Sequence, residues 1–211
     1  MLQGIEHGEE GYRLIGYDPG CSIVSLDEAD VRWLMDLALH EADLFFAEEC
    51  LLPFELGRPE KPVDAALWRA SLVALFKCFQ RSEARSRPLR ASEIYDREGR
   101  KVFRYFEGLR NGHVVHDSND VSSVVAGMVL SADGAPLEVI ALSAQRDMIS
   151  AENYSNLRLL IRRAIEWSQA EHQRESVRLI SLYAAEDFTE RPRNLTFVTP
   201  QAKMVNQPRW S

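Results

Sequence analysis

Apolar residues recur every three or four positions through most of this chain, which is the spacing of amphipathic helices. The pattern predicts four long helices and one short helical piece, near residues 26–50, 63–82, 97–113, 151–186 and 90–96. Within the long helices the positions expected to face the core are Val31, Leu34, Met35, Ala38, Ala42, Phe45 and Phe46; Leu67, Ala70, Val73, Ala74 and Phe76; Val102, Phe103, Phe106 and Leu109; and Leu157, Leu160, Ile161, Ala164, Ile165 and Trp167.

The apolar spacing changes after Asp117. Val121–Leu130 and Leu137–Leu142 are runs rich in β-forming residues. Asp133-Gly134 between them is a strong hairpin-turn signal. The sequence therefore predicts an antiparallel β-hairpin at 121–143. Because two strands alone are marginally stable in water, we expect the hairpin to pack on the helices or on a partner.

These elements predict a mainly α fold, a helical bundle with an inserted antiparallel β-hairpin. We expect this domain to occupy residues 25–190. Residues 1–24 hold several glycines and are expected to form an N-terminal arm with one short strand near 12–15. Residues 191–211 are expected to form an irregular C-terminal tail.

The composition, 45% hydrophobic and 27% charged, is typical of a soluble globular protein. There is no run of 18 apolar residues, so no transmembrane helix and no membrane partner are expected. The N-terminus lacks the basic and then apolar order of a secretory signal. Cys21, Cys50 and Cys78 have the spacing of neither a disulfide framework nor a zinc site. We therefore expect a cytoplasmic protein with no cofactor and no metal.

The formal net charge of −7 is unevenly distributed. Residues 1–60 carry fourteen Asp and Glu against three Lys and Arg, whereas residues 77–110 carry ten basic side chains against five acidic ones. A locally basic surface attracts a polyanion even when the whole chain is acidic. The alternative is that these arginines form a solvated face that pairs with the acidic N-terminal segment.

The most chemically active residues lie at 109–117, Leu-Arg-Asn-Gly-His-Val-Val-His-Asp, directly after the third amphipathic run. Two of the chain's five histidines, His113 and His116, occur here beside Arg110. Arginine stabilises an oxyanion or a phosphate, and histidine moves protons near neutral pH. Cleavage of a phosphodiester without a metal needs that pair of functions.

This stretch resembles the signature of HEPN-domain proteins, in which four to six residues separate an arginine from a histidine and a polar residue often follows the arginine. Here five residues lie between Arg110 and His116, and Asn111 takes the polar position. Residues 26–186 resemble the family in helix order, and the hairpin departs from it. The resemblance implies a metal-independent endoribonuclease with Arg110 and His116 catalytic, in a toxin–antitoxin, abortive-infection or other phage-defence system. It implies RNA as the substrate and, for a toxin, an antitoxin protein as a partner.

Physical chemistry supports the same two roles. The 2′-hydroxyl of RNA is a built-in nucleophile that needs a general base, and the transition state needs a cation. His116 suits the first task because the reference pKa of histidine is near 6.5, and Arg110 suits the second because it stays charged. On an ideal helix these two side chains lie about 120° apart. They share a face only if the helix breaks, for which Gly112 is a plausible place; otherwise two motifs meet in a homodimer, as the resemblance implies.

Neighbouring residues complete the predicted site. Asn111, His113 and Asp117 are expected to support the catalytic pair, and three arginines are expected to contact RNA: Arg104, Arg158 and Arg162.

Plainer interpretations stay open for the same residues. Arg110 would then cap the carbonyls at the end of its helix, and His113 would be a partly buried continuation of the Leu109 stripe. Asp117 would simply end the helix. The arginines of the last helix would be solvent-facing side chains paired with nearby acids.

Two other functions compete with the nuclease. His116-Asp117 is an HD dipeptide of the kind found in metal-dependent phosphohydrolases, with His40 and Asp187 as conceivable further ligands, although few ligands accompany it. The non-enzymatic alternative is a protein-interaction module of the same fold, because an exposed strand edge offers unpaired backbone groups to another chain.

Overall fold

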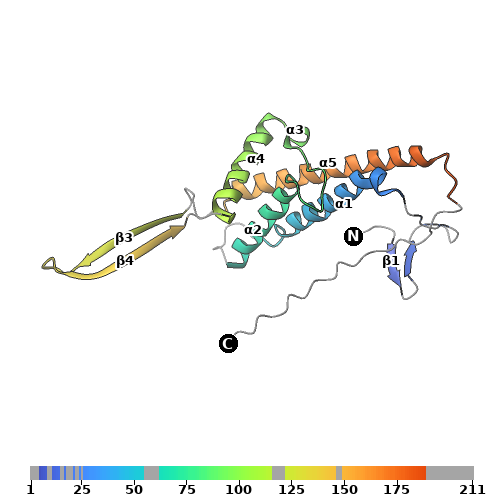
Figure 1. Ribbon diagram of the computed structural model, residues 1–211. Helices are drawn as coiled ribbons and strands as arrows, with labels where there is room; N and C mark the ends of the chain where they lie inside the picture. Colours follow the sequence, from blue (N-terminus) through green and yellow to red (C-terminus); the bar gives the residue numbers. More distant parts are fainter. Residues whose placement is uncertain are drawn as a thin grey trace. The chain divides into compact units, whose positions relative to one another are not determined.

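The computed structural model describes residues 5–8, 11–14, 17, 21, 24, 26–54, 62–115, 122–145 and 149–188. Along this part of the chain the elements follow one another as Figure 1 shows. In chain order they are β1 (Ile5–Gly8), β2 (Gly11–Leu14), α1 (Glu28–Glu49), α2 (Pro62–Lys77), α3 (Ala91–Ile94), α4 (Arg97–Leu109), the π-helical turn η1 (Arg110–Val115), β3 (Ser122–Leu130), β4 (Pro136–Gln145) and α5 (Ala151–Tyr183).

The predicted fold class is confirmed, because the structure is mainly helical with an inserted antiparallel hairpin. Helices α1, α4 and α5 lie within a few residues of their predicted bounds. Helix α2 ends at Lys77, earlier than predicted, and the chain then turns so that the Leu89 N–H donates to the Cys78 carbonyl at 2.9 Å. No helix of the described residues is both long and apolar enough to cross a membrane.

The chain divides into two compact units, Val31–Ser181 and a second one made of Met1–Asp30 with Leu182–Ser211. In the second unit β1 and β2 pair antiparallel. The sequence predicted a strand near 12–15 but not its partner. The Tyr183 hydroxyl at the end of α5 donates to the Asp30 carboxylate at 2.7 Å. This bond joins the two helix ends that belong to this unit.

In the unit Val31–Ser181, helices α1, α2, α4 and α5 bury their apolar side chains in one core. Trp68 of α2 is fully buried, and its ring meets Phe106 of α4 edge to face with centroids 6.2 Å apart. Phe103, one turn earlier on α4, packs against Phe76 with ring centroids 4.9 Å apart. Aromatic pairs of this geometry stabilise a core beyond the area they bury. They fix α4, and with it the start of the predicted catalytic motif, against α2.

The core face of α1 is not the predicted one. Met35 and Phe46 were expected to be buried, yet their exposed fractions are 46% and 50%. The buried stripe instead includes the polar residues Asp36 and His40 beside Leu37. A hydrophobicity pattern assigns an acid and a histidine to the solvent face, and their partners here come from residues 85–87, far away in sequence.

Strands β3 and β4 form the predicted hairpin, with Met128 opposite Val139. Gly134 in its turn has a φ of 85°, which a residue without a side chain adopts at little cost. Large apolar side chains of this hairpin are exposed, Val125 by 63% and Val139 by 69% among them. The expectation that the hairpin packs on the helices is therefore not met by these two side chains.

Candidate functional site

The site begins with the way α4 is anchored. Asp96 caps the helix, because its carboxylate accepts the Gly99 N–H at 2.7 Å. That bond holds the pKa of Asp96 below its usual value, with a further contribution from Arg163. Phe103 and Phe106 then bury the opposite side of the helix in the core. A capped and anchored helix gives the residues that follow it a defined position.

At Arg110 the helix changes from α to π and stays helical to Val115. The Arg110 N–H is shared between the carbonyls of Phe106 and Glu107. A π-helical turn bonds residues five apart instead of four, and such turns occur mostly as single-turn insertions, frequently at functional sites. The chain runs through Gly112 as helix, so the break at Gly112, one of the two alternatives that the sequence left open, does not occur. The other alternative, a homodimer, stays a prediction.

The Arg110 side chain is held by two side-chain amides. Its Nη1 donates to the Asn111 Oδ1 at 2.8 Å, and its Nη2 donates to the Gln80 Oε1 at 3.1 Å. Its buried Nε has no hydrogen-bond partner within the described residues. Because the Nε is covered by the protein, the donors left for a further acceptor are the second N–H groups of the two Nη atoms.

Neutral acceptors leave the Arg110 charge uncompensated. No described carboxylate pairs with it, and its side-chain bonds go to amide oxygens and not to the carbonyls of a helix end. Among the described residues, the Arg110 side chain therefore does not cap the carbonyls at the end of its helix. A guanidinium oriented in this way is suited to an anionic group, for which its planar fork provides parallel donors.

Gln80 is the site residue that the sequence did not indicate. It lies thirty residues before Arg110, just after α2, and no local motif marks it. Its position follows from the core, because α2 contacts η1 and the neighbouring Phe79 packs on Phe103 with ring centroids 4.7 Å apart. Only the tertiary structure brings it to Arg110.

The histidines of the motif are described less completely. The backbone of His113 belongs to η1, and its side chain lies outside the described part. His116 and Asp117 also lie outside the described residues. The structure thus brings together Arg110, Asn111 and Gln80, and the roles of all five predicted motif residues remain predictions.

The predicted RNA-contacting arginines are in three different environments. Arg104 is exposed on α4. Arg162 donates to Glu48 of α1 at 2.8 Å, which is the acid-paired state that the plainer interpretation predicts. Arg158 has a buried Nε without a hydrogen-bond partner in the described region.

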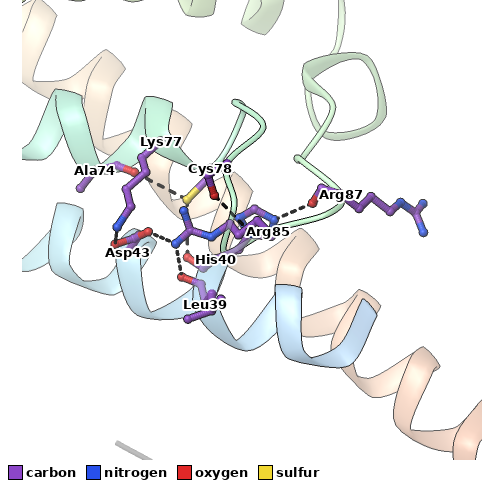
Figure 2. Close-up of polar contacts among 9 residues, drawn as sticks. Leu39, His40, Asp43, Ala74, Lys77, Cys78, Arg85 and Arg87 are labelled. Carbon is purple, nitrogen blue, oxygen red and sulfur yellow. Dashed lines mark hydrogen bonds and ion pairs between the residues drawn. The ribbon is translucent and has the colours of Figure 1, made fainter. Parts of the chain in front are cut away.

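A second polar cluster connects α1 with the chain after α2 (Figure 2). Arg85 is buried and donates to the Asp43 carboxylate and to the Leu39 carbonyl, the latter at 3.0 Å. Lys77 pairs with the other oxygen of Asp43 at 3.0 Å. The Asp36 carboxylate next to this cluster accepts the Ser86 hydroxyl at 2.6 Å. The basic residues of this part therefore do pair with the acidic N-terminal segment.

His40 and Cys78 are the titratable groups inside the second cluster. The His40 Nε2 lies 3.0 Å from the Arg87 carbonyl, to which it donates. Burial lowers the pKa of His40, and the charge of Arg85 acts in the same direction while the bond to Arg87 opposes it. Burial raises the pKa of Cys78 to about 12. Both side chains are therefore neutral near pH 7, and the cluster is suited to fixing the fold.

The described residues hold no group of three or more His, Cys, Asp or Glu placed to bind a metal ion. His40, a ligand in the competing metal interpretation, is fully buried and bonded to a backbone carbonyl. The described residues therefore offer no support for that interpretation.

No family model, no curated protein and no solved structure matches this chain.

Proposed function

We propose that the protein is a metal-independent endoribonuclease in which Arg110 and His116 act on the scissile phosphate. The observation that carries the proposal is the state of Arg110. Its guanidinium is oriented by two neutral amides and has no carboxylate beside it in the described region. This is the arrangement that an oxyanion-stabilising group needs, because the charge is positioned before the substrate arrives.

The reaction follows from the two side chains. His116 takes the proton of the 2′-hydroxyl, whose oxygen attacks the adjacent phosphorus. Arg110 stabilises the charge that accumulates on the non-bridging oxygens. The bond from phosphorus to the 5′-oxygen breaks, and the leaving oxygen takes up a proton. The products are a 2′,3′-cyclic phosphate and a 5′-hydroxyl, and the step consumes no oxidant, metal or water.

The test is incubation of the purified full chain with a mixed-sequence single-stranded RNA in excess EDTA. We expect cleavage that leaves 2′,3′-cyclic phosphate ends. Arg110→Ala and His116→Ala should each lower the rate about 10²–10⁴-fold, the usual contribution of one such group. Arg81→Ala, an exposed arginine near the end of α2, is the matched control. RNA left intact by the wild type, or cleavage unchanged in both variants, contradicts the proposal.

The hairpin favours a second candidate function, a protein-interaction module. Neither Val125 nor Val139 is covered by the described residues, and the large side chains of Met128 and Leu137 are exposed by 54% and 64%. Exposed apolar groups gathered in one element mark contact sites more often than scattered ones do. Val139→Lys should abolish association with a partner under this candidate and leave RNA cleavage unchanged under the first.

A further inference from the structure

Basic side chains gather on the side of α4 that faces away from the core. Arg97, Arg100, Lys101 and Arg104, which we call the α4 stripe, fall within about 100° of one another at 100° per residue. Phe103 and Phe106 define the buried side of the same helix. The stripe therefore runs along the outer face of α4 toward its end at Leu109, where η1 begins with Arg110.

Among the described residues, three of the four stripe cations have no acid that pairs with them. Lys101 pairs with Glu98 at 2.8 Å. Arg97, Arg100 and Arg104 make no ion pair with any described residue. The basic residues before α3 differ, because Lys77 and Arg85 both pair with Asp43. The excess of positive charge in residues 77–110 is thus neutralised in part by acidic residues of α1, while that of α4 is not neutralised by the described residues.

Gly108 continues the stripe along the outer face of α4 into the last turn of the helix. It lies four residues after Arg104, is exposed, and an ideal Cβ built there meets nothing within 4 Å. Glycine in a helix interior lowers stability relative to alanine, and neither crowding nor an unusual φ requires it here. An open glycine on a cationic face allows a phosphate to approach the helix backbone closely.

Tyr105 stands beside the stripe. Its side chain is 51% exposed, and its hydroxyl accepts from the Asn153 side chain of α5 at 3.3 Å. Its ring also contacts Phe106 edge to face with centroids 5.1 Å apart. A held and exposed aromatic ring is a platform on which an unpaired base stacks.

We propose that the α4 stripe, Gly108 and Tyr105 form a track that binds the backbone of single-stranded RNA along the outer face of α4. At 100° per residue Arg110 lies about 130° around the helix axis from the middle of the stripe, so the strand bends around the end of α4 to reach it. Arginine forks bind phosphate oxygens in parallel pairs, and a cationic path next to an aromatic ring is the arrangement used for unpaired strands. From Arg97 to Arg110 the rise is about 20 Å at 1.5 Å per residue, which a strand of several nucleotides spans. The inference rests on the proposed nuclease function.

The width of the track favours a single strand over a duplex. Glu98 and Glu107 flank the stripe on its two sides, so the positive surface is about one helix face wide. A duplex presents two phosphate backbones across a groove, and the second one would meet these carboxylates. We therefore expect a single-stranded RNA to bind more tightly than the same sequence in a duplex.

The experiment measures binding of a fluorescein-labelled 12-nucleotide single-stranded RNA to the full chain carrying His116→Ala, so that the RNA stays intact. Adding Arg100→Gln with Arg104→Gln should raise Kd at least tenfold. It should also reduce the slope of log K against log salt by about 1.4, because each single-strand phosphate contact contributes about 0.7. Gly108→Leu should also raise Kd, while its thermal unfolding temperature stays equal or rises because leucine favours helix.

The control carries Arg174→Gln with Arg178→Gln, which removes the same charge from α5, where both arginines pair with acids one turn away. It should bind RNA as the parent does. An equal loss in the control, or an unchanged Kd and slope in the α4 variant, overturns the track. Tighter binding of the duplex than of the single strand also overturns it.

The experiments distinguish failure of the proposed track from failure of the proposed nuclease function. In the His116-containing protein the Arg100 and Arg104 double variant should raise KM for a long RNA by a much larger factor than KM for a dinucleoside monophosphate. Binding along α4 with no cleavage by the wild type would refute the nuclease and keep the track. Cleavage that depends on Arg110 but is indifferent to Arg100 and Arg104 would refute the track alone.

Discussion

The partners of an arginine decide what its charge is available for. Arg85 and Arg162 form ion pairs with carboxylates of α1, which neutralise the charge of both arginines. Arg110 is bonded to the amides of Asn111 and Gln80, which orient the guanidinium without neutralising it. A hydrogen bond to a charged group contributes more than a neutral one. Gln80 is therefore proposed as a positioning residue that acts through Arg110.

We predict that Gln80→Ala lowers kcat for RNA cleavage about 10–100-fold, since losing a hydrogen bond to a charged group costs roughly 1.5–3 kcal/mol. KM should change little, because Gln80 orients the group that acts in the transition state. In the Arg110→Ala background the same substitution should have no further effect, which a double-mutant cycle measures. Additive losses in the cycle would show that Gln80 does not act through Arg110.

A second prediction concerns His40 and pH. Its pKa is lowered in the folded state, so the unfolded chain binds the proton first as the pH falls below the ordinary value of 6.5. The free energy of unfolding should therefore be highest above about pH 6.5 and decrease as the pH falls toward the folded pKa. For one proton the slope reaches at most about 1.4 kcal/mol per pH unit. The groups that face His40 are Arg85, Asp36 and Asp43.

Urea unfolding between pH 5 and 8 measures this dependence. His40→Gln keeps a donor for the Arg87 carbonyl and removes the titration, so its stability should vary less over the same range. A variant as pH-dependent as the wild type would show that other groups cause the loss.

Among the elements, η1 determines how the motif continues beyond α4. A turn with bonds between residues five apart holds one more residue than the corresponding α turn. We predict that inserting one alanine after Gly112 rotates the residues after it by about 100° relative to Arg110, because the turn already holds its one extra residue. RNA cleavage should fall to background while the helical circular dichroism and the unfolding temperature stay close to wild type.

The length-preserving variant Gly112→Ala is the control for this insertion. It should retain most of the cleavage activity, since the number of residues between Arg110 and His116 is unchanged. Full activity in the insertion variant would show that the register set by η1 is not required.

Local patterns predicted the elements well because each has a strong period of its own. Phe103 and Phe106 mark the core face of α4 correctly, and Asp133-Gly134 marks the hairpin turn. The buried face of α1 could not be predicted in this way. Asp36 and His40 are buried only because partners from residues 85–87 satisfy them, and such pairing over some fifty residues leaves no local signal.

The site was predictable to the same extent. The position of Arg110 and its neighbour Asn111 follow from the motif. The contact with Gln80 and the π geometry depend on how α2 and α4 pack, and helical periodicity alone predicted neither.

For the whole molecule, we predict a homodimer with one motif of each copy close to the other. The reason is the angle of about 120° that an ideal helix places between Arg110 and His116. Light scattering at micromolar concentration should give twice the chain mass of 24.1 kDa. Mixing Arg110→Ala with His116→Ala protein should restore activity if each site takes one residue from each copy. A monomer that is fully active at that concentration would contradict the prediction.

The burial of Cys78 makes it a natural reporter of local opening. It lies between α1 and the chain that follows α2, with its thiol directed at the His40 and Ala74 carbonyls. With a pKa of about 12, only about one such thiol in ten thousand is ionised at pH 8, and the thiolate is the form that attacks a labelling reagent. Cys21 is exposed and is expected to react first. The rate of the slow labelling phase of Cys78 would then report how often residues 85–87 separate from α1, and no engineered probe is needed for the measurement.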